Sequence, residues 1–315
     1  MTAQRSRDTL ATMVIQNWPD VLPPRGRIAY VNGHYVPHRD AAVHVEDRAL
    51  QLGDGVYEVC AVAAGKLIDE EEHLDRLERS TREIELGMPM DRAALRLVFR
   101  ELVRRNRVRD GLLYLQVTRG AVHRDHPIPD KPPRPTLIMT AYALDPAPIA
   151  KRREEGIAVI TQPDERWARR DIKTVQLLPN LIAKTAARRA GAYEAWLVED
   201  GAVTEGTSTT AWIVDRDGNL VTRSLSHAIL PGVTRRVILE VAAQSQIRVV
   251  ERTFTPDEAC SAREAFISSA NGIHPVTSID GKVIGDGRRG AVTRRVQELY
   301  ARHAGISAAG TERRG

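Results

Sequence analysis

The sequence predicts a mixed α/β protein with two domains, a smaller one at residues 27–144 and a larger one at residues 151–304. A chain of 315 residues is longer than one small hydrophobic core usually supports. Segments with strand and helix periodicity alternate in both halves, which is typical of α/β proteins. A stretch with two prolines at 145–150 is the expected linker between the domains. Residues 1–26 are expected to form an N-terminal extension, and residues 305–315 a flexible tail.

The smaller domain is expected to begin with a β-hairpin. Asn32-Gly33 separates two short alternating segments, and this dipeptide between such segments is a strong hairpin signal. Strands are expected at 28–31, 34–36, 55–63, 112–118 and 136–142, and helices at 70–86 and 91–106. Asp91 is a suitable N-cap for the second helix. The proline-rich segment 126–135 cannot pair in a sheet, so a loop is expected there.

The larger domain is expected to alternate strands and helices less regularly. Strands are expected near 157–162, 194–199, 210–214 and 265–269, and helices near 180–190, 233–246 and 289–303. In the middle helix, Val237, Ile238 and Val241 share one face, which predicts that this face is buried.

The overall charge does not predict nucleic-acid binding. The chain has 46 basic and 41 acidic residues, a net charge of +5 and a pI of about 9.4. The arginines are scattered among the acids, and aromatic residues make up only 4% of the chain. These features favour a solvated, arginine-rich surface over a basic footprint or a base-stacking platform.

The cysteines and the apolar segments indicate a cytoplasmic protein. Cys60 and Cys260 lack metal-binding or redox spacing, so buried free thiols and no metal site are expected. No apolar run reaches membrane-spanning length, and the charged residues near the N-terminus argue against a signal peptide.

Lys173 is the first candidate for chemistry. Only six of the 46 basic residues are lysines, so arginine occupies most positions where charge alone suffices. Lys173 lies in a mostly apolar run shortly before a predicted helix, and an amine can form an imine with an aldehyde, which arginine cannot do. An amine can also move a proton to and from a carbon atom. An ordinary surface lysine is the alternative for this residue considered alone.

Two later segments supply complementary groups. Glu205, in Thr204-Glu205-Gly206, could keep a pyridine nitrogen protonated, because a nearby negative charge favours the cationic form. Gly232-Val233-Thr234 begins the predicted helix at 233–246, and the amides of a helix N-terminus bind phosphate. A turn acid and a simple helix cap are the alternatives. Together, an amine, a carboxylate and a phosphate site are the groups that pyridoxal phosphate requires.

Six strings, in the same order, resemble the class IV aminotransferases, which are the fold-type IV pyridoxal-phosphate enzymes. The strings are Glu46-Asp47-Arg48 with Gly53-Asp54-Gly55-Val56-Tyr57-Glu58; His73-Leu74-Asp75-Arg76-Leu77; Gln116-Val117-Thr118-Arg119-Gly120; Asp171-Ile172-Lys173; Val203-Thr204-Glu205-Gly206; and Leu230-Pro231-Gly232-Val233-Thr234-Arg235. The resemblance covers about residues 27–303 and is closest to the D-amino acid aminotransferases. It implies a larger domain with a β-barrel-like sheet. It also implies ping-pong transamination between D-amino acids, such as D-alanine and D-glutamate, and 2-oxo acids.

The resemblance also implies roles for the residues around the cofactor. Lys173 would bond to the cofactor aldehyde, Glu205 would face the pyridine nitrogen, and Leu230 would pack against the ring. Val233, Thr234 and Arg76 would hold the phosphate. A surface ion pair with Glu72 is the alternative for Arg76.

A second phosphate loop is expected within the segment 266–276. The segment resembles the corresponding loop of the family but is about one residue shorter. Ser269, Ala270 and Asn271 are the residues expected at the cofactor there.

The substrate side of the site depends on the segment Arg124-Asp125-His126. The resemblance implies that Arg124 and His126, with Tyr57, bind the substrate α-carboxylate. It also implies that this loop reaches the site of a neighbouring subunit, which requires a homodimer. A solvated basic loop, a metal pair of His123 and His126, and a plain strand tyrosine are the alternatives.

Several other functions remain open from the sequence alone. A branched-chain aminotransferase, an (R)-amine transaminase and an aminodeoxychorismate lyase belong to the same family. A family member without turnover and a basic non-enzymatic binding protein are further alternatives.

Overall fold

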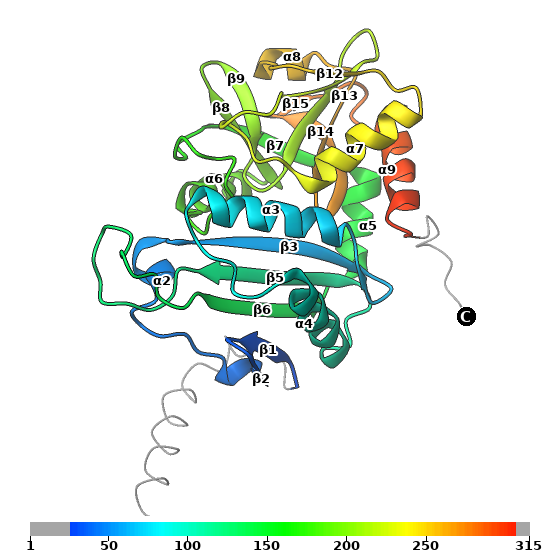
Figure 1. Ribbon diagram of the computed structural model, residues 1–315. Coiled ribbons are helices and arrows are strands. Elements are labelled where there is room, and N and C mark those ends of the chain that lie inside the picture. The colour runs from blue at the N-terminus through cyan, green and yellow to red at the C-terminus, as the bar shows by residue number, and fades with distance from the viewer. Residues whose placement is uncertain (1–25, 307–315) are drawn as a thin grey trace, which may run out of the picture.

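The computed structural model describes residues 26–306, and two β-sheets that follow each other in the sequence divide this part of the chain (Figure 1). The predicted N-terminal extension and most of the predicted tail lie outside the described residues. The predicted mixed α/β architecture is confirmed, since both sheets are accompanied by helices.

The first sheet is antiparallel throughout and has the strand order β2-β1-β6-β5-β3-β4. The elements of this half of the chain are β1 (Ile28–Val31), β2 (His34–Pro37), η1 (His38–Asp40), α2 (Arg48–Leu52), β3 (Gly55–Ala63), β4 (Lys66–Leu67), α3 (Glu70–Glu83), α4 (Arg92–Arg105), β5 (Gly111–Thr118) and β6 (Thr136–Ala143). The predicted hairpin is confirmed, and Asp91 caps α4 by accepting a hydrogen bond from Ala94 N.

The second sheet is mixed and has the order β12-β11-β10-β13-β14-β7-β8-β9, with β15 paired to β14. Its elements are α5 (Pro146–Glu155), β7 (Ile157–Pro163), α6 (Leu178–Arg189), β8 (Glu194–Glu199), β9 (Ala202–Gly206), β10 (Thr210–Val214), β11 (Leu220–Thr222), α7 (Val233–Gln244), β12 (Val249–Glu251), α8 (Pro256–Cys260), β13 (Glu264–Ser269), β14 (Gly272–Ile279), β15 (Lys282–Val283) and α9 (Ala291–His303). Residues 146–150, in the expected linker, form the start of α5, because Asp145 caps the helix and proline is favourable in its first turn.

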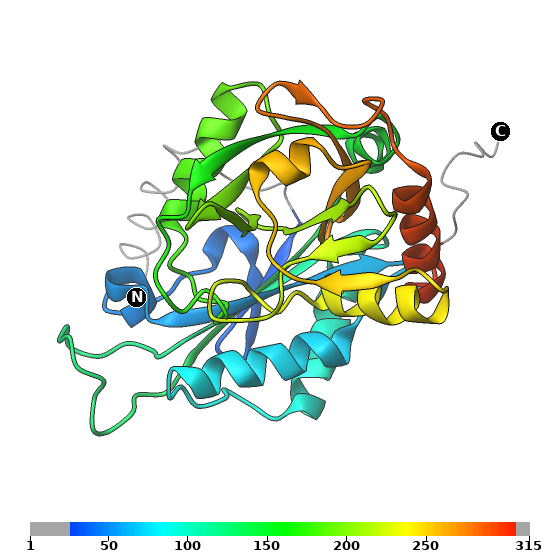
Figure 2. The same ribbon diagram turned by 90° about the horizontal axis from the view of Figure 1, so that it is seen from above.

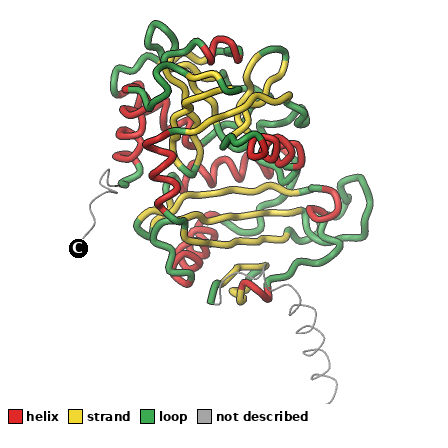
Figure 3. Tube along the Cα trace, turned by 180° about the vertical axis from the view of Figure 1, so that it is seen from behind, coloured by secondary structure: helices red, strands yellow, loops and turns green. Residues whose placement is uncertain are grey.

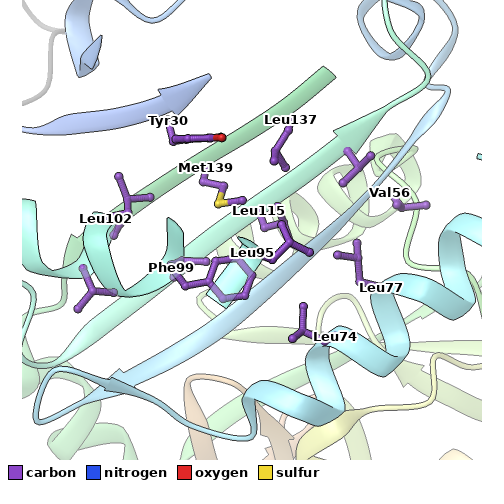
Figure 4. Packing of buried hydrophobic residues seen from close by; sticks show 14 of the residues in the cluster. Tyr30, Val56, Leu74, Leu77, Leu95, Phe99, Leu102, Leu115, Leu137 and Met139 are labelled. Carbon is purple, nitrogen blue, oxygen red and sulfur yellow. The ribbon is translucent and has the colours of Figure 1, made fainter. Parts of the chain in front are cut away.

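Two helices bury their apolar faces against the first sheet. Figure 4 shows Leu74 of α3 and Leu95 and Phe99 of α4 beside Leu115 and Met139 of the strands, and all five side chains are almost inaccessible to solvent. Burial of each such side chain contributes about 2 kcal/mol. This packing holds α3 rigidly on β3.

α3 also lies along the junction of the two sheets (Figure 1). Its Arg79 donates hydrogen bonds to Asp171, and its Arg76 donates one to Pro231 O, both in the second half of the chain. At the chain end, His303 of α9 lies 2.7 Å from Asp69, which precedes α3. Residues from both halves can therefore meet at this junction.

The long loop between β5 and β6 lies beside α2, and Figures 1 and 3 agree on this placement. Viewed from above, the loop projects away from the body of the protein (Figure 2). No helix among the described residues is long and apolar enough to cross a membrane. Cys60 is buried, Cys260 is half-buried, and both are free thiols.

Candidate active site

A cleft of about 200 Å³ lies at the junction of the two sheets. Ten of the twelve residues singled out from the sequence line it, and they come from both halves of the chain. These ten are Tyr57, Arg76, Lys173, Glu205, Leu230, Val233, Thr234, Ser269, Ala270 and Asn271.

Lys173 is held by its backbone between β3 and α3. Its carbonyl accepts a hydrogen bond from Tyr57 N at 3.0 Å, and its amide donates to Ser80 Oγ at 3.4 Å. Its Nζ lies 4.4 Å from the centroid of the Tyr57 ring, within the range of a cation–π contact. These contacts direct the amine into the cleft.

Glu205 is a buried carboxylate on β9. It is only 5% exposed, and its partners are Arg166 Nη1 at 2.5 Å and Leu230 N at 3.2 Å. Burial raises the pKa of Glu205, and Arg166, the Leu230 amide and Lys173 offset part of the rise. Asp164 accepts two hydrogen bonds from the other side of Arg166, with Oδ1 2.9 Å from Nε and Oδ2 2.7 Å from Nη2. A carboxylate fixed in this way can face a cationic group in the cleft.

The N-terminus of α7 faces the same cleft with free amides. Gly232 is its N-cap, and no described side chain caps the first turn. A Cβ at Gly232 would lie 3.0 Å from Thr210 Oγ1, so the backbone approaches the neighbouring strand closely. Free amides at a helix start, with Val233 and Thr234 lining the cleft, are suited to bind an anion.

Arg76 adds a positive charge next to this helix start. Its Nε and Nη2 each lie 2.8 Å from a Glu58 oxygen, and its Nη1 lies 3.1 Å from Pro231 O. His73 Nδ1 is 2.7 Å from Glu58. Burial alone would raise the pKa of Glu58, but Arg76 and His73 lower it well below its ordinary value. Glu58 thus stays ionised and keeps Arg76 directed at the cleft, unlike the alternative surface pair with Glu72.

A tight turn at 206–209 connects β9 and β10 along the cleft. Gly206 N donates to Thr209 O at 2.7 Å, and a Cβ on Gly206 would lie 2.1 Å from Thr209 Oγ1. Behind the turn, the fully buried Glu194 accepts from Thr207 Oγ1 at 2.5 Å and from Thr209 Oγ1 at 3.3 Å. Ser208, between these two threonines, also lines the cleft.

The segment 266–276, expected to contain a second phosphate loop, consists of the end of β13, a two-residue turn and the start of β14. β13 ends at Ser269, β14 begins at Gly272, and these two residues pair. Ala270 and Asn271 form the turn, and Ser269 Oγ accepts from Asn271 N at 3.2 Å. This short turn therefore places Ser269, Ala270 and Asn271 at the wall of the cleft.

Arg124 and His126 do not line the cleft of their own chain. Both are exposed in the β5–β6 loop, which has no helix or strand in this region. Within residues 26–306, no group of three or more His, Cys, Asp or Glu side chains is arranged to hold a metal ion.

Several residues of the site are not identified from the sequence. In the sequence analysis Arg166 counts among the scattered surface arginines, and no role is assigned to Glu58 or Glu194. Glu58 follows Tyr57 directly in a matched string, so its position was available as a signal. Arg166 and Glu194 carry no such signal, because Glu205 and Thr207, which they bind in the site, lie 39 and 13 residues away in the sequence.

The groups in the cleft fit pyridoxal phosphate. An amine and a buried carboxylate line it, and an uncapped helix N-terminus with nearby glycine and hydroxyl groups matches a phosphate. At Gly206 and Gly232 the backbone passes so close to the hydroxyls of Thr209 and Thr210 that a larger residue would have to displace them.

Comparison with known proteins supports the same assignment. A model of the amino-transferase class IV family matches residues 55–279. D-alanine aminotransferase of Listeria monocytogenes (strain 10403S) is 41% identical over 272 residues, which cover 86% of this chain and 93% of that protein. D-alanine aminotransferase of Bacillus licheniformis is 40% identical over 267 residues, which cover 84% and 93%.

Solved structures share the fold. Branched-chain amino acid aminotransferase of Escherichia coli superposes with a TM-score of 0.79 at 26% identity, covering 92% of this chain and 97% of that chain. Branched-chain aminotransferase of the archaeon Thermoproteus uzoniensis, solved with norvaline, has a TM-score of 0.77 at 25% identity and covers 90% and 97%. Another branched-chain amino acid aminotransferase, complexed with N-(5'-phosphopyridoxyl)-L-glutamate, has a TM-score of 0.79 at 26% identity and covers 91% and 97%.

Proposed function

The chain belongs to the class IV aminotransferases, and from this premise we propose that it transfers amino groups between D-amino acids and 2-oxo acids by a ping-pong mechanism. The observation that carries this function is the cleft that joins Lys173, Glu205 and the free N-terminus of α7. Relatives named D-alanine aminotransferase match most of the chain. This similarity supports D-amino acids, rather than the substrates of other family members, as the substrates of this chain.

The residues that would hold pyridoxal phosphate follow from their placement in the cleft. Lys173 would bond to the aldehyde, Glu205 would face the ring nitrogen, and Leu230 would pack against the ring. The amides at Val233 and Thr234, with Arg76 and the two turns at 206–209 and 269–271, would hold the phosphate. The bound cofactor supplies an aldehyde that reacts with amines and a ring that accepts electrons from the substrate Cα.

Lys173 moves the proton in this reaction. Its backbone is held by Tyr57 and Ser80, and its amine lies over the Tyr57 ring inside the cleft. There it takes the proton from the substrate Cα and later returns a proton. Glu205, paired with Arg166, holds a proton on the ring nitrogen by its negative charge.

Tyr57, Arg124 and His126 form the proposed site for the substrate carboxylate. Arg124 and His126 lie outside the cleft of their own chain, which supports a role in the site of a second subunit. A guanidinium and an imidazole two residues apart can bind one carboxylate together with the Tyr57 hydroxyl.

A homodimer would also cover an exposed apolar surface. On α6, Leu178, Leu181 and Ile182 are 67%, 58% and 57% exposed. Leu52 of α2 and Trp167 line the same hollow as Leu178 and Leu181. Because these side chains adjoin the cleft, a partner seated there would exclude water from it. We propose this surface as the dimer interface.

We propose a cytoplasmic location, where the unpaired Cys60 and Cys260 would stay reduced. We also propose that the two sheets belong to two domains, residues 27–144 and 151–304.

The test is a half-reaction with each alanine enantiomer. Adding D-alanine to the purified holoenzyme should convert the cofactor absorbance to that of the amine form, while L-alanine should not. Conversion by L-leucine or by (R)-phenylethylamine, without conversion by D-alanine, would assign a different member of the family. Borohydride reduction followed by peptide mapping should label the peptide with Lys173, and absence of that label would refute the lysine assignment.

A further inference from the structure

Arg48 is a buried arginine whose partners lie in the substrate loop. It is the first residue of α2 and only 3% exposed. Its Nη1 donates to Asp125 O at 2.7 Å, and its Nη2 donates to His126 O at 3.3 Å. A buried guanidinium is costly unless it is paired and hydrogen-bonded, so these contacts form part of its environment.

Asp54 pairs with Arg48 on the other side. Its Oδ2 lies 2.7 Å from Arg48 Nε, and the same carboxylate also binds Arg119. Burial alone would raise the pKa of Asp54, but its hydrogen bonds to Arg119 and Arg48 lower the pKa below its ordinary value. Asp54 therefore remains ionised at neutral pH and keeps the Arg48 guanidinium in place.

The base of the loop is fixed to the same region. Arg48 N donates to Gly120 O at 3.0 Å, Val122 N donates to Glu46 O at 3.4 Å, and Asp47 forms a bridge with Ala121. Beyond this base the loop has no helix or strand. Within the described part of the chain, the hydrogen bonds that join residues 123–132 to the rest of the protein are the two from Arg48.

We propose that Arg48 is a positioning residue for the substrate carboxylate: it holds the carbonyls of Asp125 and His126, and thereby fixes where Arg124 and His126 stand. The inference rests on the function proposed above. Because Arg48 binds main-chain carbonyls, it sets the direction of the loop backbone rather than the conformation of one side chain. Since the loop would serve a neighbouring subunit, Arg48 of one subunit would tune substrate binding in the other.

Arg119 provides a matched control. It is equally buried, at 3% exposure, and shares the Asp54 carboxylate. Its remaining bonds go to Ile84 O and Glu85 O at the end of α3, away from the loop. If Arg48 and Arg119 only stabilised the fold through Asp54, replacing either arginine would therefore have the same effect on KM.

The experiment compares Arg48→Lys with Arg119→Lys in the holoenzyme. Lysine keeps the charge but cannot bind Asp54 and both carbonyls together. Arg48→Lys should raise KM for D-alanine about tenfold with kcat changed less than about twofold, because binding rather than chemistry is weakened. Arg119→Lys should leave KM within about twofold of the unmodified value, even if it lowers the melting temperature as much as Arg48→Lys does. Equal KM values in the two variants would overturn the proposal.

Limited proteolysis with trypsin supplies a second readout that does not depend on turnover. Cleavage after Arg124 should be about tenfold faster in Arg48→Lys than in Arg119→Lys, because the loop backbone loses its two hydrogen bonds to Arg48. In the unmodified protein this cleavage should be slower than in a free peptide of the same loop, and equal rates would overturn the proposal even if the variant failed to fold. A lack of D-alanine turnover by the unmodified holoenzyme would refute the proposed function instead, while the cleavage measurement would still test Arg48.

Discussion

Arg166 Nη1 lies 2.5 Å from Glu205 Oε1, while the opposite side of the same guanidinium is bound to Asp164. Glu205 therefore receives a single N–H from an arginine that another carboxylate holds in place. Burial raises the pKa of Glu205, and Arg166 is the first of the groups that oppose this rise. The charge next to the ring nitrogen thus depends on Arg166 as well as on Glu205.

Replacing Arg166 by glutamine should narrow the pH range of activity. Loss of the guanidinium raises the pKa of Glu205 further, so the carboxylate is protonated at higher pH. The acid limb of the pH profile of kcat/KM for D-alanine should move upward by about one unit. Arg252→Gln is the control, because Arg252 binds Glu258 and does not line the cleft. Coincident profiles for Arg166→Gln and the unmodified enzyme would contradict this role.

Replacing Glu205 by glutamine should lower kcat by a factor of about 100 or more, because a neutral amide cannot stabilise a cationic ring nitrogen. The change keeps the side-chain size, so the dissociation constant of the cofactor should change much less. Steady-state kinetics and cofactor titration measure the two effects. Glu199→Gln, at a half-exposed carboxylate, should leave kcat nearly unchanged.

Glu58→Gln should destabilise the protein in a pH-dependent manner. The pKa of Glu58 is lowered in the folded state, so its stabilisation is fully present above the ordinary value of 4.5 and declines as pH falls below it. At pH 7, removal of this partner of Arg76 should lower the free energy of unfolding by about 3 kcal/mol. Urea denaturation at pH 7 and pH 3.5 should show a smaller difference at the lower pH. The exposed Glu240→Gln should cost less than about 1 kcal/mol at either pH.

Gly206→Ala should weaken cofactor binding. The added Cβ would lie 2.1 Å from Thr209 Oγ1, so the turn must shift away from its hydrogen bonds with Glu194. Cofactor titration of the apoenzyme should give a dissociation constant raised about tenfold or more. Gly87→Ala is the control, because a Cβ there meets no atom within 4 Å. An unchanged constant for Gly206→Ala would show that the turn does not contact the cofactor.

Leu178→Asp should convert the protein to monomers. Leu178 is 67% exposed on the apolar face of α6, and a charge there would oppose burial against a second subunit. Light scattering after size-exclusion chromatography measures the change, and D-alanine turnover should fall with it. Leu97→Asp, at a leucine that is 65% exposed on α4, should remain dimeric. If both variants stay dimeric, the interface lies elsewhere.

Elements with strong local signals could be predicted from the sequence. The Asn32-Gly33 hairpin, β3, and α4 with its Asp91 cap lie within a few residues of the predicted positions. Short elements such as α2 and β12 were missed, because five or three residues carry too little periodicity. β14 was not predicted, because residues 272–276 lie in the segment where a phosphate loop was expected. The strand contains Pro275, which precedes Val276, where pairing with β7 begins, so its missing N–H does not interrupt that pairing.

The candidate site could be predicted only where one residue type in a short string points to its chemistry. Lys173, Glu205 and the Gly232 helix start belong to this class. The functions of Arg166 and Arg48 could not be predicted, since they depend on Glu205 and Asp125, which are 39 and 77 residues away in the sequence. The placement of buried arginines follows from tertiary packing, which a pattern of neighbouring residues does not encode.

The hydrogen bond from Arg76 to Pro231 joins residues that are 155 positions apart in the sequence. The anion site at α7 is therefore complete only after α3 has docked on the later half of the chain, and contacts of such long range form slowly. In a refolding experiment, uptake of the cofactor is expected to lag behind the recovery of helical signal. The absorbance of bound pyridoxal phosphate would then report the rate of the last stage of assembly.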